Sequence, residues 1–112
     1  MKHLLLVISI LILSSPAIGN KQNGGILYLL GEYPDWEWVE FGDKKTQPTY
    51  QGQVKDGKPN GLGILISTNG WKYFGSWMNG KIWSGTEYDH YGNIIYSWTE
   101  GRRKYHNLYK SY

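Results

Sequence analysis

The sequence contains no cysteine and has few residues of the kinds that support covalent or metal-based chemistry. The absence of cysteine excludes disulfide bonds, thiolate metal sites and a lipid anchor on a cysteine, so stability has to come from packing. Histidine is limited to His3, His90 and His106, and there is no Gly-x-Ser-x-Gly nucleophile motif. No segment shows sustained helical periodicity with capping residues. We therefore expect no catalytic residues and no cofactor.

Long hydrophobic runs are also scarce, and the only prominent one is Leu4–Leu13. It is about half as long as the roughly 20 apolar residues that a membrane-spanning helix needs. A short basic start precedes it, and the small residues Ala17 and Gly19 stand where a signal peptidase reads. We predict a signal peptide over residues 1–19, cleaved near Gly19/Asn20, and an exported protein that is periplasmic or secreted. The alternative is an uncleaved N-terminal segment that anchors the protein in a membrane.

Aromatic residues are abundant in the rest of the sequence, residues 20–112. These 93 residues hold all six Trp, ten Tyr and two Phe, whereas aliphatic residues are sparse among them. The length suits one small domain and is too short for two. Aromatic and β-branched side chains favour strands, and rings can replace a thick aliphatic core. The composition therefore indicates one all-β domain.

Short strand-like segments alternate with turn dipeptides along this domain. Four dipeptides tolerate positive φ and favour tight hairpins: Asp56-Gly57, Asn60-Gly61, Asn69-Gly70 and Asn79-Gly80. Seven segments have strand composition: Ile26–Leu30, Trp36–Phe41, Tyr50–Lys55, Leu62–Thr68, Trp71–Met78, Thr86–Tyr88 and Asn93–Thr99. The sequence predicts an elongated antiparallel β-meander of about seven strands.

A repeat with a period of 23 residues runs through Tyr50, Tyr73 and Tyr96. The phrases YQGQVKDGK and YFGSWMNGK, which begin at the first two tyrosines, share the tyrosine, the glycine two residues later and a Gly-Lys pair. A fixed short period is typical of stacked repeat arrays, which mostly bind other molecules. The phrases resemble the MORN repeat, roughly Tyr-x-Gly-x-Trp-x-x-Gly-Lys-x-x-Gly-x-Gly. The residues assigned to the repeat scaffold are Tyr50, Gly52, Gly57, Gly61, Gly63, Tyr73, Gly75, Trp77, Gly80 and Tyr96.

The resemblance weakens toward the C-terminus. The second repeat has Thr86-Glu87 where a second glycine is expected, and the third loses two residues before Gly101. We interpret the third repeat as a cap, because the last unit of an array meets water on one side. The chain thus divides into the signal peptide, an N-terminal β-hairpin and lead-in (20–49), MORN-like repeats (50–101) and a basic, aromatic tail (102–112).

The spacing of tyrosine and glycine indicates a structural role for both. Side chains two residues apart share one face of a strand, so Gly52 and Gly75 leave bare backbone beside the repeat tyrosines. A ring from the neighbouring strand can lie on that backbone and offset the poor strand propensity of glycine. We predict the same arrangement at Gly61 and Gly63.

Charges of opposite sign are concentrated at opposite ends of the domain. Acidic residues lie at the start, and four basic residues follow the last acid. They are Glu32, Asp35, Glu37, Glu40 and Asp43 at the start, and Arg102, Arg103, Lys104 and Lys110 at the end. We expect one acidic and one basic end of the sheet. The basic set is a candidate contact for an anionic membrane, and the alternative is that both ends are solvated rims.

A metal site has little support in the sequence. Glu87, Asp89 and His90 lie close together in an expected turn, but no fourth ligand stands at a suitable spacing. A polar turn explains these residues better, and we predict no metal.

Three functions fit the sequence, and the resemblance implies a curved sheet that acts as a protein-interaction or membrane-proximal scaffold without enzymatic activity of its own. The leading expectation is a protein partner bound on an aromatic face. The candidate exposed rings, which lie outside the tyrosine and glycine core of the repeat, are Trp36, Trp38, Trp71, Trp83 and Tyr91. The alternatives are stacking of these rings on a cell-surface carbohydrate, or contact of the basic tail with anionic membrane. We expect no nucleic-acid partner.

Overall fold

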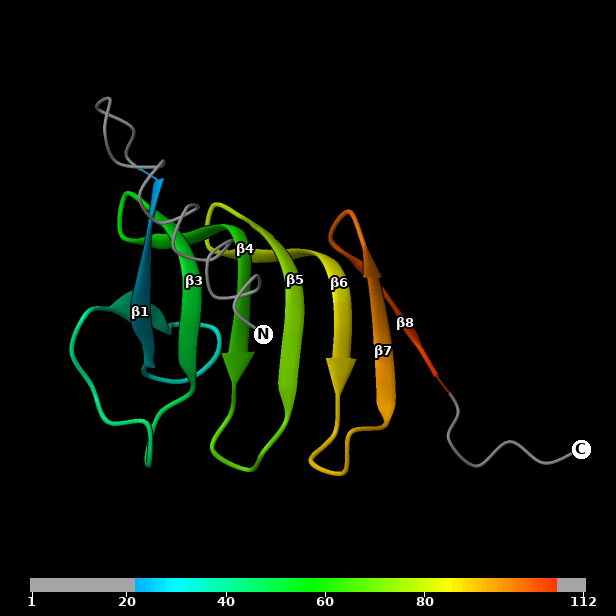
Figure 1. Cartoon of the computed structure of the whole chain (residues 1–112). Helices are drawn as coiled ribbons and strands as arrows, with labels where there is room; N and C mark the ends of the chain where they lie inside the picture. The colour runs from blue at the N-terminus through cyan, green and yellow to red at the C-terminus, as the bar shows by residue number, and fades with distance from the viewer. Residues whose placement is uncertain (1–21, 107–112) are drawn as a thin grey trace, which may run out of the picture.

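The computed structural model describes residues 22–106, which form one open sheet of eight antiparallel strands (Figure 1). The strands are β1 (Gln22–Leu30), β2 (Glu37–Val39), β3 (Thr49–Lys55), β4 (Lys58–Ile66), β5 (Lys72–Met78), β6 (Lys81–Tyr88), β7 (Ile94–Thr99) and β8 (Arg102–Tyr105). Their order in the sheet is β2-β1-β3-β4-β5-β6-β7-β8. The predicted all-β meander is confirmed from β3 onward. At the start the chain departs from it, because β1 lies between β2 and β3.

The strand boundaries differ from the sequence prediction in several places. Strand β1 begins four residues earlier than predicted, and β2 is shorter than the predicted Trp36–Phe41. Asn60-Gly61 was predicted to form a turn, but it lies inside β4, and this prediction was wrong. The turn at Asp56-Gly57 already reverses the chain, so residues from Lys58 onward are free to pair with β3. For the same reason β6 begins directly after the Asn79-Gly80 turn and is longer than expected. Strand β8 was not predicted at all.

Three tight turns lie at one end of the sheet, at the top of Figure 1. Asp56-Gly57, Asn79-Gly80 and Glu100-Gly101 have positive φ at both residues. This conformation matches the twist of antiparallel strands and selects Asn, Asp and Gly. The third turn creates β8, and the sequence signal for it is weak because Glu stands in the position that Asp56 and Asn79 occupy.

Cross-strand pairing assembles two rows on one side of the sheet, which we call the aromatic face. The tyrosine row runs from β1 to β8 and consists of Leu27, Tyr50, Leu65, Tyr73, Glu87, Tyr96 and Tyr105. The glycine row runs beside it and consists of Gly25, Gly52, Gly63, Gly75 and Gly85, followed by Trp98 and Arg103. The repeat therefore lines up like residues across the strands.

The repeat tyrosines cover the glycine row, as the sequence predicted. A Cβ on Gly63 would collide with the ring of Tyr50, and a Cβ on Gly85 would stand 2.7 Å from the hydroxyl oxygen of Tyr73. Each hydroxyl donates a hydrogen bond to the carbonyl three residues later, from Tyr50 to Gln53 at 2.6 Å and from Tyr73 to Ser76 at 2.9 Å. The glycines are thus needed for close approach, because a Cβ would displace the Tyr50 ring at Gly63 and would also strike the backbone of the neighbouring strand at Gly85.

The core is a cluster of rings on the aromatic face. Tyr50, Tyr73, Trp77 and Leu27 are at most 5% exposed. Trp77 stands edge-on between the two tyrosines, with ring centroids 5.1 Å from Tyr50 and 5.2 Å from Tyr73. Its indole nitrogen donates to the carbonyl of Gly63 at 3.2 Å. Edge-to-face packing of this kind adds about 0.5–1.5 kcal/mol per pair beyond area burial.

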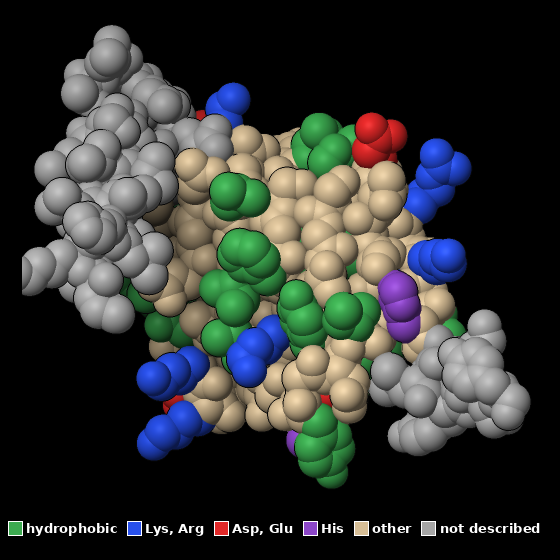
Figure 2. All heavy atoms as spheres, turned by 45° about the vertical axis from the view of Figure 1, so that its right-hand side comes forward, with side chains coloured by type: hydrophobic (Ala, Val, Ile, Leu, Met, Phe, Trp, Pro, Cys, Tyr) green, Lys and Arg blue, Asp and Glu red, His purple; other side chains and the backbone are tan. Residues whose placement is uncertain are grey.

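The opposite face of the sheet is more exposed. Figure 2 shows hydrophobic side chains gathered in the middle of this face, with basic side chains among and around them. The exposed apolar residues that alternate away from the aromatic face include Ile26, Leu62, Ile66 and Phe74. The core cluster of Leu27, Tyr50, Tyr73 and Trp77 therefore lies on the aromatic face.

The early acids and the late basic residues lie toward opposite edges of the sheet, although Lys44 and Lys45 share the segment after β2 with Glu40 and Asp43. Glu37 is in β2, at one edge, and the other early acids lie in the segments that flank β2. Arg102, Arg103 and Lys104 are in β8, at the opposite edge. Lys110 and the predicted signal peptide lie outside the described residues.

Candidate functional site

All six tryptophans line two adjoining hollows of the aromatic face. The larger hollow, the tryptophan groove, has a volume of about 620 Å³. Its aromatic lining consists of Trp36, Trp38, Trp77, Trp83 and Trp98. The smaller, the Glu87 hollow, has a volume of about 370 Å³ and includes Trp71, Tyr73 and Glu87. Leu65 and Ile82 line both, so the two hollows form one continuous surface.

Strand β2 supplies one wall of the tryptophan groove. The ring of Trp38 stands edge-on to Tyr50 and Trp77, with centroids 6.0 Å and 5.9 Å away. Its indole nitrogen donates a hydrogen bond to the carbonyl of Gly80, in the turn after β5, at 3.2 Å. Three strands, β1, β3 and β4, lie between β2 and β5 in the sheet. The sheet must therefore curl strongly toward the aromatic face. Trp36 continues this wall and is 49% exposed.

Residues of β6, β7 and the last turn form the opposite wall. The pairing of β5 with β6 shifts register between Gly75 and Trp77, and Trp83 lies within this irregularity of β6. The Glu100-Gly101 turn lies over Trp83, because the amide of Gly101 donates to the Trp83 carbonyl at 2.8 Å. Trp98 continues the glycine row on β7 and fills a position that is bare backbone on the preceding strands.

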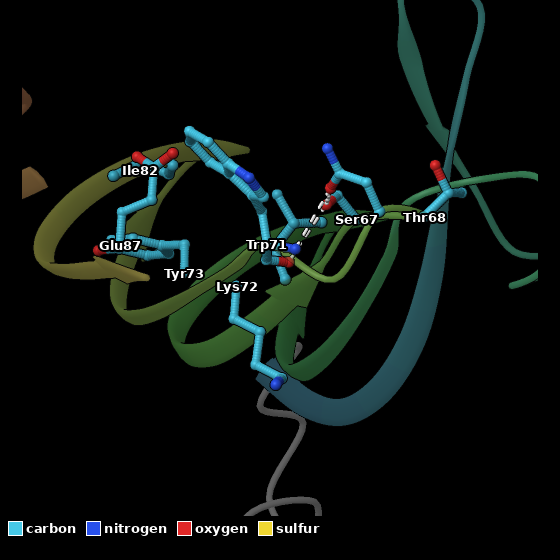
Figure 3. A pocket seen from close by; sticks show the side chains of 9 residues that line it. Ser67, Thr68, Trp71, Lys72, Tyr73, Ile82 and Glu87 are labelled. Carbon is cyan, nitrogen blue, oxygen red and sulfur yellow. Dashed lines mark hydrogen bonds between the residues drawn. The ribbon is translucent and has the colours of Figure 1, made fainter. Parts of the chain in front are cut away.

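The Glu87 hollow holds one carboxylate among rings. One Glu87 oxygen accepts a hydrogen bond from the indole nitrogen of Trp98 at 3.1 Å. Figure 3 shows Glu87, Ile82 and Tyr73 on one side of the hollow, Trp71 extending toward them and Lys72 pointing away. Burial raises the pKa of Tyr73 to about 12, with the charge of Glu87 adding to the rise and a hydrogen bond from the Trp83 backbone opposing it. Ionised Tyr73 is therefore disfavoured in this setting.

The structure brings four of the five candidate rings together. Trp36, Trp38, Trp71 and Trp83 line the two hollows, although only Trp36 is largely exposed. Tyr91 does not line them. It lies in the loop between β6 and β7, is 80% exposed, and stacks on His90 with ring centroids 3.9 Å apart.

Two lining residues could not be identified by spacing alone. Trp77, which was assigned to the scaffold, is both a core residue and part of the groove lining. Trp98 was missed, although it stands two residues after Tyr96, where the earlier repeats have Gly52 and Gly75. That departure from the repeat was the available signal.

The basic residues of β8 do not form one surface. The guanidinium of Arg103 lies 4.1 Å from the centroid of the Tyr96 ring on the aromatic face. By alternation along the strand, Arg102 and Lys104 belong to the opposite face. Tyr96 is half-buried between Arg103 and Tyr105, whose ring centroid is 5.6 Å away.

The three residues considered as metal ligands, Glu87, Asp89 and His90, do not form one site. Glu87 faces the hollow, whereas Asp89 organises its own loop by accepting hydrogen bonds from the amides of Tyr91 and Asn93, each at 2.9 Å. Over residues 22–106 there is no group of three or more side chains that could hold a metal ion. The same residues include no helix with the length and apolar character to cross a membrane.

Comparison with known proteins identifies the repeat. The sequence model of the MORN repeat family matches residues 50–72 and 73–83. The two matched segments begin at Tyr50 and Tyr73, the two tyrosines that cover the glycine row. Neither the curated proteins nor the solved structures gave a match to the chain.

Proposed function

Because this chain is a MORN-repeat protein, we propose that it is an interaction module that binds an extended segment of a partner protein in the tryptophan groove. Repeats of this family generally serve as protein- or membrane-interaction modules. The observation that carries the proposal is the placement of all six tryptophans on the two hollows of one face. Trp77 is buried in the core, whereas the other five retain exposed area that a ligand could cover.

Tryptophan suits a binding surface for a physical reason. It presents a large apolar area, has few rotatable bonds to immobilise, and dominates the energetic centres of many interfaces. In the tryptophan groove the walls formed by Trp36 and Trp83 stand on either side of a floor that includes Leu65 and Ile82. An extended segment can insert alternate side chains between such walls.

The ring geometry favours a protein segment over a carbohydrate. Stacking on a sugar needs at least two exposed rings that lie in one plane, with polar neighbours. The planes of Tyr33 and Trp36, two exposed rings in contact, instead meet at 85°. A carbohydrate ligand is therefore the weaker alternative.

The arrangement of β8 gives less support to membrane binding. Arg103 belongs to one face of the edge strand and Arg102 and Lys104 to the other, so these charges cannot meet a flat surface together. Attraction to anionic lipid is screened over about 8 Å at physiological salt. Groove binding should persist as salt rises, whereas vesicle binding through β8 should be lost.

Export is the proposed setting of this interaction. It is supported by the apolar run and by Ala17 and Gly19, residues outside the described part of the chain. Mass spectrometry of protein purified from the envelope and from the medium tests it. A mature N-terminus near Asn20 would support cleavage, and an intact Met1 in the membrane fraction would favour the anchor.

The groove is tested with the purified chain as bait against an envelope extract, scored for protein, glycan and lipid. For a captured protein, Trp83→Ala should weaken binding by about 30-fold, as expected for an interfacial tryptophan. Tyr91→Ala is the matched control, because it removes an exposed ring outside the groove. Equal effects of the two substitutions, or capture of lipid alone, would contradict the proposal.

A further inference from the structure

Glu87 is the one charged residue in the tyrosine row. Its neighbours in that row are Tyr73 on β5 and Tyr96 on β7. On β4 the equivalent position between two tyrosine-bearing strands is Leu65, and on β1 the position beside Tyr50 is Leu27. The tyrosine row thus has a carboxylate between Tyr73 and Tyr96, at a position where the earlier strands β1 and β4 have leucine. A carboxylate in place of leucine costs stability unless the charge has a partner or a function.

The intramolecular partner of Glu87 is a neutral group. The indole nitrogen of Trp98 donates to one carboxylate oxygen at 3.1 Å. No lysine or arginine among residues 22–106 forms an ion pair with Glu87: Lys72 points away from the hollow in Figure 3, and Arg103 lies over Tyr96 instead. The carboxylate therefore retains acceptor sites that face a hollow lined by Trp71, Tyr73 and Ile82, and Lys72 also contributes to this lining although its side chain extends away from Glu87.

We propose that the Glu87 hollow binds a cationic side chain, arginine or lysine, of the partner segment whose apolar residues occupy the tryptophan groove. This inference rests on the proposed function, and it adds a required charge to the ligand. Leu65 and Ile82 join the two hollows, so one extended segment can reach both. The preferred ligand is an extended stretch in which aromatic or aliphatic residues stand next to one basic residue.

A carboxylate beside aromatic rings is chemically suited to a cation. The carboxylate accepts charge-assisted hydrogen bonds, and ring faces attract the same cation through their quadrupole. This face of the sheet already holds a cation in that manner, since the Arg103 guanidinium lies 4.1 Å from the Tyr96 ring centroid, one strand away from Glu87. An anionic ligand would instead meet the negative charge of Glu87 and be repelled.

The test is selection of random dodecapeptides on the full chain at physiological ionic strength, followed by affinity measurements on synthetic peptides. We expect the selected peptides to share one arginine or lysine beside apolar residues. Replacing that arginine by citrulline, which has nearly the same shape without the charge, should weaken binding by about tenfold, or about 1.4 kcal/mol.

The protein variants locate the effect. Glu87→Gln keeps an acceptor for Trp98 and should remove the preference for arginine over citrulline, and Glu87→Leu, which restores the side chain present at Leu65, should do the same. Glu40→Gln is the matched control, since it removes a carboxylate at an exposed site outside both hollows and should keep the preference.

The outcomes separate this inference from the proposed function. Peptides that depend on Trp83 but bind equally to the protein with Glu87 and with Glu87→Gln would overturn the cation site and leave the groove intact. Selected peptides that are indifferent to both Trp83→Ala and Glu87→Gln would overturn both proposals.

Discussion

The first two repeats and the third use the same strand geometry for different purposes. In the first two, Tyr50 and Tyr73 cover glycines and are almost completely buried. In the third, Trp98 stands at the next position of the glycine row, and Tyr96 is only half-buried beneath Arg103. Where the row is bare backbone, rings pack inward and form the core. Where Trp98 follows the glycines of this row, its side chain forms part of a wall of the tryptophan groove.

This difference shows that the candidate site forms where the repeat is broken. Glu87 and Trp98 occupy positions that are aliphatic and glycine on earlier strands, and they contact each other through a hydrogen bond of 3.1 Å. The two regular repeats form the packed core beneath the hollows. The irregular C-terminal end contributes the carboxylate of Glu87 and the ring of Trp98.

The largest expected effect is the loss of a buried repeat tyrosine. Tyr73→Ala should lower the free energy of unfolding by about 3–5 kcal/mol, because it removes a large buried ring. Tyr96→Ala should lower it by only about 1 kcal/mol, since less area is returned to water. Urea unfolding followed by tryptophan fluorescence measures both. Equal losses would show that the third tyrosine is a core residue like the other two.

The glycine row gives the second comparison. Gly63→Ala should cost about 1–3 kcal/mol, because the new methyl group would collide with the Tyr50 ring and force repacking. Gly24→Ala, on β1, is the control, since the space around its Cβ position is open. If both variants unfold at the same urea concentration, the rings do not depend on bare backbone.

Alkaline pH should weaken the first two repeats. Burial raises the pKa of Tyr50, and burial together with the Glu87 charge raises that of Tyr73 to about 12. Because the unfolded pKa is about 10, this stabilisation is complete below about pH 10 and is lost as pH rises toward 12. The free energy of unfolding should fall over this interval, and less steeply in Tyr73→Phe, which cannot ionise. A profile identical to the wild type in Tyr73→Phe would contradict this assignment.

The smallest effect concerns the loops at the other end of the strands. Although desolvation acts to raise the pKa of Asp89, hydrogen bonds from Asn93 and Tyr91 outweigh it and lower the pKa below its ordinary value. A lowered pKa stabilises the fold above about pH 4 and ceases to do so as pH falls through the folded value. Asp89→Asn should therefore flatten the acid side of the stability profile slightly. Amide exchange at Tyr91 and Asn93 should quicken, while the loop before β5 exchanges as before.

Much of the fold could be predicted from the sequence because the repeat specifies both turns and packing. Asp56-Gly57 and Asn79-Gly80 mark hairpins through their backbone preferences, and tyrosine followed by glycine marks the ring-on-backbone contact. Asn60-Gly61 misled the prediction because the same dipeptide tolerates positive φ within a strand, as Gly61 does at 103°. Local chemistry alone does not distinguish the two settings.

The candidate site was only partly predictable. The tryptophans outside the repeat pattern were identified as a group, but the curl that brings Trp38 of β2 to Gly80 depends on the whole sheet. Trp98 could be found from the repeat spacing, but Glu87 required the cross-strand register. The second repeat is one residue shorter at this point, so Glu87 does not align with Leu65 in the sequence. Pairing across strands reveals that equivalence.

The hydrogen bond from Trp38 to Gly80 also has a consequence for the order of folding. From β3 onward every strand pairs with its neighbour in the sequence, so these contacts close short loops and form quickly. Trp38 and Gly80 are 42 residues apart and can meet only after β3, β4 and β5 are aligned. The N-terminal hairpin should therefore dock late, and the tryptophan groove should be completed in the final step of folding.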